Sequence, residues 1–92
     1  MNKARWSMKQ ITILGLGNSR HRQLSSNIEA VIRELDLSVD VEQIMEVEQI
    51  LSSGVDSIPA VVLNGHVIFD GKTNPTRAEL KDALMLNQQE VN

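Results

Sequence analysis

The sequence predicts an α/β domain built on one mixed four-stranded sheet with helices on both faces. Short apolar runs rich in β-branched residues alternate with longer amphipathic segments in the order strand, helix, strand, helix, strand, strand, helix. A turn signal at Asn64-Gly65 separates the last two apolar runs, which makes them an antiparallel hairpin. A chain of 92 residues fits a single domain of this kind.

The first half predicts two parallel strands joined by a helix. Residues 10–14 form a β-branched apolar run that stops at the glycine-containing turn 15–17, as a buried strand does. Over residues 19–36, apolar side chains recur at helical spacing and charged side chains occupy the other faces, so we expect an amphipathic helix. Valines alternate with acidic residues over 37–44, which predicts a second strand. The general handedness rule makes the crossover between them right-handed.

The second half predicts a short helix, a hairpin and a closing helix. Residues 46–53 carry apolar side chains on one helical face. The runs 60–63 and 66–69 flank Asn64-Gly65, the dipeptide that best tolerates the positive φ angles of a tight type I′ turn. The last helix is expected over 76–86.

The start of the last helix carries a recognisable capping pattern. Thr76 is followed three residues later by Glu79, the spacing of a capping box. We expect residues 8–86 to form the single domain, with 1–7 as a flexible N-terminal extension and 87–92 as a frayed polar tail.

Composition excludes several classes of function. The 92 residues contain no cysteine, which excludes a disulfide scaffold, a thiolate zinc site, an iron–sulfur cluster and a cysteine nucleophile within them. A net charge of −3 argues against nucleic acid or an anionic membrane as partner. The two histidines lack the spacing of a metal site, so we expect no metal and no cofactor. Without a secretory signal or a long apolar run, the chain is expected to be soluble and cytoplasmic.

A nucleotide-binding turn is a competing interpretation of residues 15–21. Gly15 and Gly17 follow a strand and open a helix, as in the dinucleotide-binding fingerprint. Arg20 stands where the third glycine belongs, and the later hairpin interrupts the parallel sheet that such a unit requires. We therefore do not expect nucleotide binding.

Four segments resemble the small glutaredoxin-like branch of the thioredoxin superfamily. They are the turn Gly15-Leu16-Gly17-Asn18-Ser19-Arg20-His21, the stretch Ser57-Ile58-Pro59-Ala60, the Asn64-Gly65 hairpin and the Gly71-Lys72 turn. The resemblance extends over residues 8–86. It implies a thioredoxin fold with sheet order 2-1-3-4 and a cis peptide bond between Ile58 and Pro59.

In that family the turn before the first helix carries Cys-x-x-Cys, and the two cysteine positions fall on Asn18 and His21. Thiol–disulfide exchange needs a nucleophilic thiolate and a resolving thiol, so it is excluded for a chain without cysteine. The resemblance still implies the family's binding groove beside the proline. The candidate groove residues are Asn18, Ser19, Arg20, His21, Ser57, Ile58 and Pro59, and none of them is assigned a catalytic role.

From the predicted groove we expect a peptide, a glutathione-like thiol or a protein as partner. We expect the chain itself to be a monomer or a weak homodimer. Free amides at a helix N-terminus favour an anion, and Arg20 strengthens this preference. Each candidate also has a purely structural interpretation. Asn18 or Ser19 would cap the helix, Arg20 and a partly exposed His21 would be solvated, and Pro59 would only shape the fold. The alternatives to a binding module are a cysteine-independent enzyme and a relic whose fold alone persists.

Overall fold

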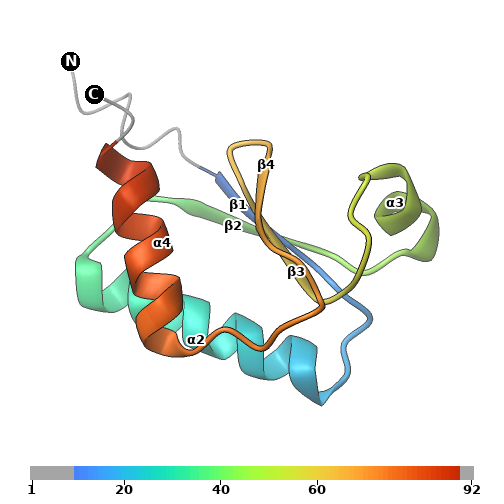
Figure 1. The fold of residues 1–92 in the computed structure, drawn as a ribbon, viewed down its shortest axis with the longest axis horizontal. Helices are drawn as coiled ribbons and strands as arrows, with labels where there is room; N and C mark the ends of the chain where they lie inside the picture. Colours follow the sequence, from blue (N-terminus) through green and yellow to red (C-terminus); the bar gives the residue numbers. More distant parts are fainter. Residues whose placement is uncertain (1–9, 90–92) are drawn as a thin grey trace.

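Seven elements make up the fold in the order that the sequence predicts. We describe residues 10–89 of a computed structural model, drawn in Figure 1. The elements are β1 (Gln10–Leu14), α2 (Ser19–Leu35), β2 (Asp40–Ile44), α3 (Val47–Ser52), β3 (Ala60–Leu63), β4 (His66–Phe69) and α4 (Arg77–Gln89).

The strands form one sheet in the order β2-β1-β3-β4. β1 pairs in parallel with β2, with Ile13 opposite Gln43, and antiparallel with β3, with Ile13 opposite Val61. The sheet is therefore mixed, as predicted. Its order 2-1-3-4 confirms the thioredoxin fold that the resemblance implied.

The β3–β4 hairpin turns at Asn64-Gly65. Both residues have positive φ angles, 52° and 87°, as a type I′ turn requires, so the predicted hairpin is confirmed. Leu63 faces His66 across the turn, and the pairing shifts register by a bulge further along β3.

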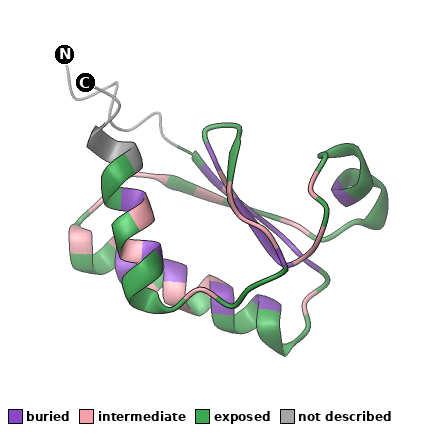
Figure 2. Cartoon of the chain, viewed as in Figure 1, coloured by how far each residue is buried: buried purple, intermediate pink, exposed green. Residues whose placement is uncertain are grey.

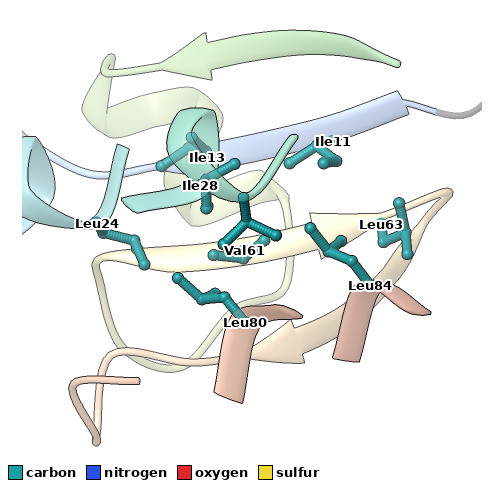
Figure 3. Close-up of a cluster of buried hydrophobic side chains, with 9 residues drawn as sticks. Ile11, Ile13, Leu24, Ile28, Val61, Leu63, Leu80 and Leu84 are labelled. Carbon is teal, nitrogen blue, oxygen red and sulfur yellow. The ribbon is translucent and has the colours of Figure 1, made fainter. Parts of the chain in front are cut away.

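The main core lies between one face of the sheet and two helices. Figure 1 shows α2 and α4 together on this face, and three of the buried residues of α2, a helix with purple segments in Figure 2, belong to the core cluster: Leu24, Ile28 and Val31. Strand side chains alternate between faces, so β1 and β3 each send every second residue into this layer. Figure 3 shows the cluster, whose labelled members are Ile11, Ile13, Leu24, Ile28, Val61, Leu63, Leu80 and Leu84.

The opposite face carries only α3. Leu14 and Ala60 point to this face and pack with Ile50, the one buried residue of α3. A helix of six residues covers only one end of the sheet. Most residues of α3 are themselves exposed (Figure 2). Helices therefore lie on both faces, but the two layers are unequal.

The ends of the elements differ from the predicted ones by a few residues. α2 stops at Leu35 because Asp36 adopts a left-handed conformation and Leu37 N–H returns to the Ile32 carbonyl, 3.0 Å away. This cap shortens the following strand, which begins at Asp40 and not at residue 37.

The closing helix begins as predicted and ends later. Thr76 Oγ1 accepts a hydrogen bond from Glu79 N–H at 3.1 Å, while Glu79 Oε1 accepts one from Thr76 N–H at 2.8 Å, which confirms the capping box. α4 continues to Gln89, three residues beyond the predicted end of the last helix, because no glycine or proline ends it earlier. Residues 1–7 and 90–92 of the predicted extension and tail lie outside the described residues.

One peptide bond departs from the trans geometry. The Ile58-Pro59 peptide bond is cis, as the resemblance implied. None of the helices between residues 10 and 89 combines the length and the hydropathy needed to span a membrane.

Candidate functional site

The first turn of α2 begins with a side-chain cap. Asn18 has an extended backbone, and its Oδ1 accepts a hydrogen bond from His21 N–H at 3.0 Å, which confirms that Asn18 acts as an N-cap. Ser19, the first helical residue, is exposed. The capping side chain leaves Ser19 free to face solvent and the neighbouring loop.

His21 was expected to be a partly exposed, solvated side chain, and this expectation is wrong. Only 3% of its surface is exposed. Its Nδ1 accepts a hydrogen bond from Gly17 N–H at 2.9 Å, so the neutral ring carries its hydrogen on Nε2 and donates it to Gln43 Oε1 at 2.7 Å. Gln43 Nε2 in turn donates to Ser25 Oγ at 3.1 Å. The imidazole therefore joins the turn, the helix and β2 and does not face the candidate groove.

Arg20 makes structural contacts that the solvated interpretation did not predict. Its Nε donates to Asn74 Oδ1 at 2.7 Å, and one terminal amino group donates to the Gly71 carbonyl at 2.8 Å. A longer bond of 3.3 Å reaches the Thr73 carbonyl. All three acceptors are neutral, so the guanidinium charge holds the 71–74 loop against α2 without being neutralised there.

The Ile58-Pro59 loop packs against Gly71. Gly71 N–H donates to the Ser57 carbonyl at 3.1 Å, and a Cβ added at Gly71 would collide with the Ile58 backbone. Pro59 is buried, whereas Ser57 and Ile58 are half-buried. The amide and carbonyl of Ile58 make no hydrogen bond to any other residue between 10 and 89. Ile58 therefore offers one backbone donor and one acceptor beside the start of α2.

Two hollows adjoin this loop. The larger, about 380 Å³, lies between α2 and the 73–75 segment, and its lining includes Ser19, Arg20 and Pro59. The smaller, about 220 Å³, lies toward α3 and its lining includes Ser57 and Ile58. Five of the seven predicted groove residues thus line two hollows that meet at the cis peptide bond. Asn18 lines neither, and His21 lines a shallow depression near β2.

Comparison with known proteins agrees with this geometry. Residues 9–85 match the sequence model of the family described as thioredoxin domain. The chain belongs to the thioredoxin-domain family. It is also similar to a protein named thioredoxin from Methanothermobacter thermautotrophicus strain Delta H, with 29% identity over 77 residues. That match covers 84% of this chain and 99% of the relative.

This thioredoxin-domain chain retains the fold but contains no thiol. The two positions where the resemblance places cysteines carry a capping amide, Asn18, and a buried, hydrogen-bonded imidazole, His21. Neither group carries a sulfur atom, so neither can take part in a disulfide bond. Within residues 10–89, no three histidine, aspartate or glutamate side chains come together as a possible metal site.

Sequence reasoning missed three groups that shape the site. Gln43 follows Val39 and Val41 in the strand alternation, so a polar residue on the strand face that carries the two valines was the available signal. Gly71 was noted only as part of a turn, yet its lack of a side chain allows the close approach to Ile58. Asn74, the partner of Arg20, carries no signal in the sequence because the contact spans 54 positions.

Proposed function

We propose that this chain is a redox-inactive thioredoxin-like binding module. It holds an extended peptide, a glutathione-like thiol or a segment of another protein noncovalently at the Ile58-Pro59 loop. The observation that carries the proposal is the unpaired amide and carbonyl of Ile58, placed between two hollows. An extended ligand satisfies such groups in the way an added strand satisfies a sheet edge.

The larger hollow suits a polar or anionic ligand group. Arg20 lines it, and the Arg20 guanidinium is bonded only to neutral acceptors. Ser19 lies on the same wall, at the positive end of the α2 dipole. A carboxylate of a bound peptide or thiol compound would therefore gain charge-assisted hydrogen bonds there.

Several sequence-based expectations accompany the proposal and stay predictions. They are a cytoplasmic location, membership of the glutaredoxin-like branch, a monomeric or weakly dimeric state, and the lack of nucleic acid and membrane partners.

The test is an amide NMR titration of the full-length labelled chain with glutathione and then with a short unstructured peptide. We expect localised shifts at Ser19, Arg20, Ile58 and Ala60. Gln23→Trp, which adds bulk to the lining of the larger hollow, should weaken binding, whereas Gln49→Trp on the exposed surface of α3 should not. If neither ligand shifts these amide signals in a folded sample, the binding-module proposal is wrong and the relic interpretation takes its place.

A further inference from the structure

Exposed apolar side chains gather on the α3 side of the Ile58 loop. Leu16, Val47 and Leu51 expose 53%, 57% and 75% of their surface, and we call these three residues the apolar patch. Leu16, Val47 and Leu51 line the 220 Å³ hollow together with Ile58. Such a concentration of exposed aliphatic side chains next to a hollow is typical of an interaction surface.

The surroundings of the apolar patch are acidic. The segment that carries α3 and the loop after it, residues 45–58, contains Glu46, Glu48 and Asp56 and no lysine or arginine. Glu46 and Glu48 flank Val47, and Asp56 lines the hollow.

These three carboxylates lack a cation to balance them. Glu46, Glu48 and Asp56 are exposed, and none forms an ion pair with any residue from 10 to 89. Arg20 is held on the other side of the loop by its bonds to the 71–74 segment. The negative charge around the apolar patch is therefore available to a partner.

We propose that the apolar patch binds a positively charged segment of a partner protein. An aliphatic side chain of that segment enters the 220 Å³ hollow, and its lysines or arginines lie against Glu46, Glu48 and Asp56. This inference rests on the proposed function, because Ile58 lines the hollow and offers its backbone to the same segment.

Charge also argues against two other occupants. A second copy related by twofold symmetry would bring the same acidic residues face to face, which costs free energy. An anionic lipid surface would be repelled for the same reason. A basic protein segment with aliphatic anchors complements both the apolar and the charged features.

The test uses methyl and amide NMR titrations of the full-length chain with three short synthetic peptides. One alternates lysine with leucine, the second has glutamate in place of lysine, and the third has serine in place of leucine. We expect the first alone to shift the signals of Leu16, Val47 and Leu51, and rising salt to weaken its binding.

Matched variants of the chain locate the interaction. Leu51→Ser should lower the affinity for the lysine–leucine peptide by about tenfold, the effect of removing a central contact of an interface. The double change Glu48→Gln with Asp56→Asn should lower it by about the same factor. The controls Leu86→Ser, also at an exposed leucine (62% exposed), and Glu29→Gln on α2 should leave its affinity unchanged.

Four results would overturn the inference. The first two are that the glutamate peptide binds as tightly as the lysine–leucine peptide, and that Leu51→Ser leaves the affinity for the lysine–leucine peptide unchanged. The third is that the NMR signals of the apolar patch shift with protein concentration alone. The fourth is that these signals shift, without peptide, in the triple variant Lys3→Gln/Arg5→Gln/Lys9→Gln. The last two would assign the patch to a second copy or to the chain's own basic N-terminal segment.

The same titrations separate this inference from the proposed function. If all three peptides shift Ile58 and Ala60 equally, the groove binds peptides but the charge selection is wrong. If the lysine–leucine peptide shifts Leu51 and Val47 but leaves Ile58 and Ser19 unchanged, the apolar patch binds and the proposed groove does not.

Discussion

Two neighbouring residues at the start of α2 fasten this helix to different parts of the fold. His21 bonds to the preceding turn and to β2, whereas Arg20 bonds to the loop before α4. Consecutive helical residues point about 100° apart, so their side chains reach different sides of the helix start. Together they hold the α2 N-terminus beside the Ile58 loop.

Replacing His21 with alanine should destabilise the chain by about 2–3 kcal/mol, because Gly17 N–H loses its acceptor and a buried ring is removed. Urea denaturation measures the change in the free energy of unfolding. His66→Ala, at an exposed position of β4, is the control and should change it by less than about 0.5 kcal/mol. Equal effects of the two substitutions would show that the His21 hydrogen bonds contribute no stability.

Gly71→Ala tests the packing of the Ile58 loop. The added methyl group would collide with the Ile58 backbone, so one of the two segments must move. We expect a loss of about 1–3 kcal/mol in the free energy of unfolding, together with a shifted Ile58 amide signal. Lys72→Ala, at the adjacent exposed position, should leave both unchanged. An unshifted Ile58 signal in Gly71→Ala would contradict the close approach.

At the scale of elements, α2 and α4 form one layer that is joined by apolar packing and by one ion pair at its surface. Lys81 Nζ lies 2.7 Å from Glu34 Oε2. The hydrogen bond and the positive charge from Lys81 lower the pKa of the Glu34 carboxyl below its ordinary value of 4.5. The pair is exposed, so its contribution to stability is small.

The lowered pKa of Glu34 fixes the sign of a pH effect. A carboxyl with a lower pKa in the folded chain stabilises it above the unfolded pKa, and this contribution is lost as pH falls through the folded pKa. Glu34→Gln should therefore be slightly less stable than the parent near neutral pH, and the difference should shrink as pH falls below 4.5. Thermal unfolding across this range measures it. In a chain that also carries Lys81→Met, the stability difference caused by Glu34→Gln should not change with pH in this way.

At the scale of the whole molecule, the thioredoxin fold is complete without its usual thiols. The positions that the family resemblance assigns to cysteines lie at the N-cap and in the first turn of α2, where the helix dipole stabilises a thiolate. The fold therefore has a helix N-terminus at the positions where the resemblance places the two cysteines, and the chain has no thiol there.

The double substitution Asn18→Cys with His21→Cys should create a reversible disulfide. We expect a reduction potential between about −270 and −120 mV, the range of thioredoxin-like oxidoreductases. Equilibration in glutathione buffers, followed by mass spectrometry of trapped thiols, measures it, and the two single-cysteine variants are the controls. A folded double variant that forms no intramolecular disulfide would show that these positions do not correspond to the cysteine pair.

Much of this fold could be predicted because its elements depend on nearby residues. Apolar periodicity located α2, the Asn64-Gly65 pair located the hairpin, and Thr76 with Glu79 located the start of α4. Helix and strand ends were less predictable. The cap at Asp36 and the continuation of α4 to Gln89 depend on small differences in local free energy.

The candidate site was predicted only in part. The sequence by its pattern and family resemblance determined the fold, the sheet order, the cis bond before Pro59 and the loss of thiol chemistry. Only tertiary structure decided that His21 is buried against Gln43, that Arg20 holds the 71–74 loop, and which site residues line each hollow. Those roles depend on contacts between residues distant along the chain, and no local pattern encodes which polar partner the folded chain will bring within hydrogen-bonding distance.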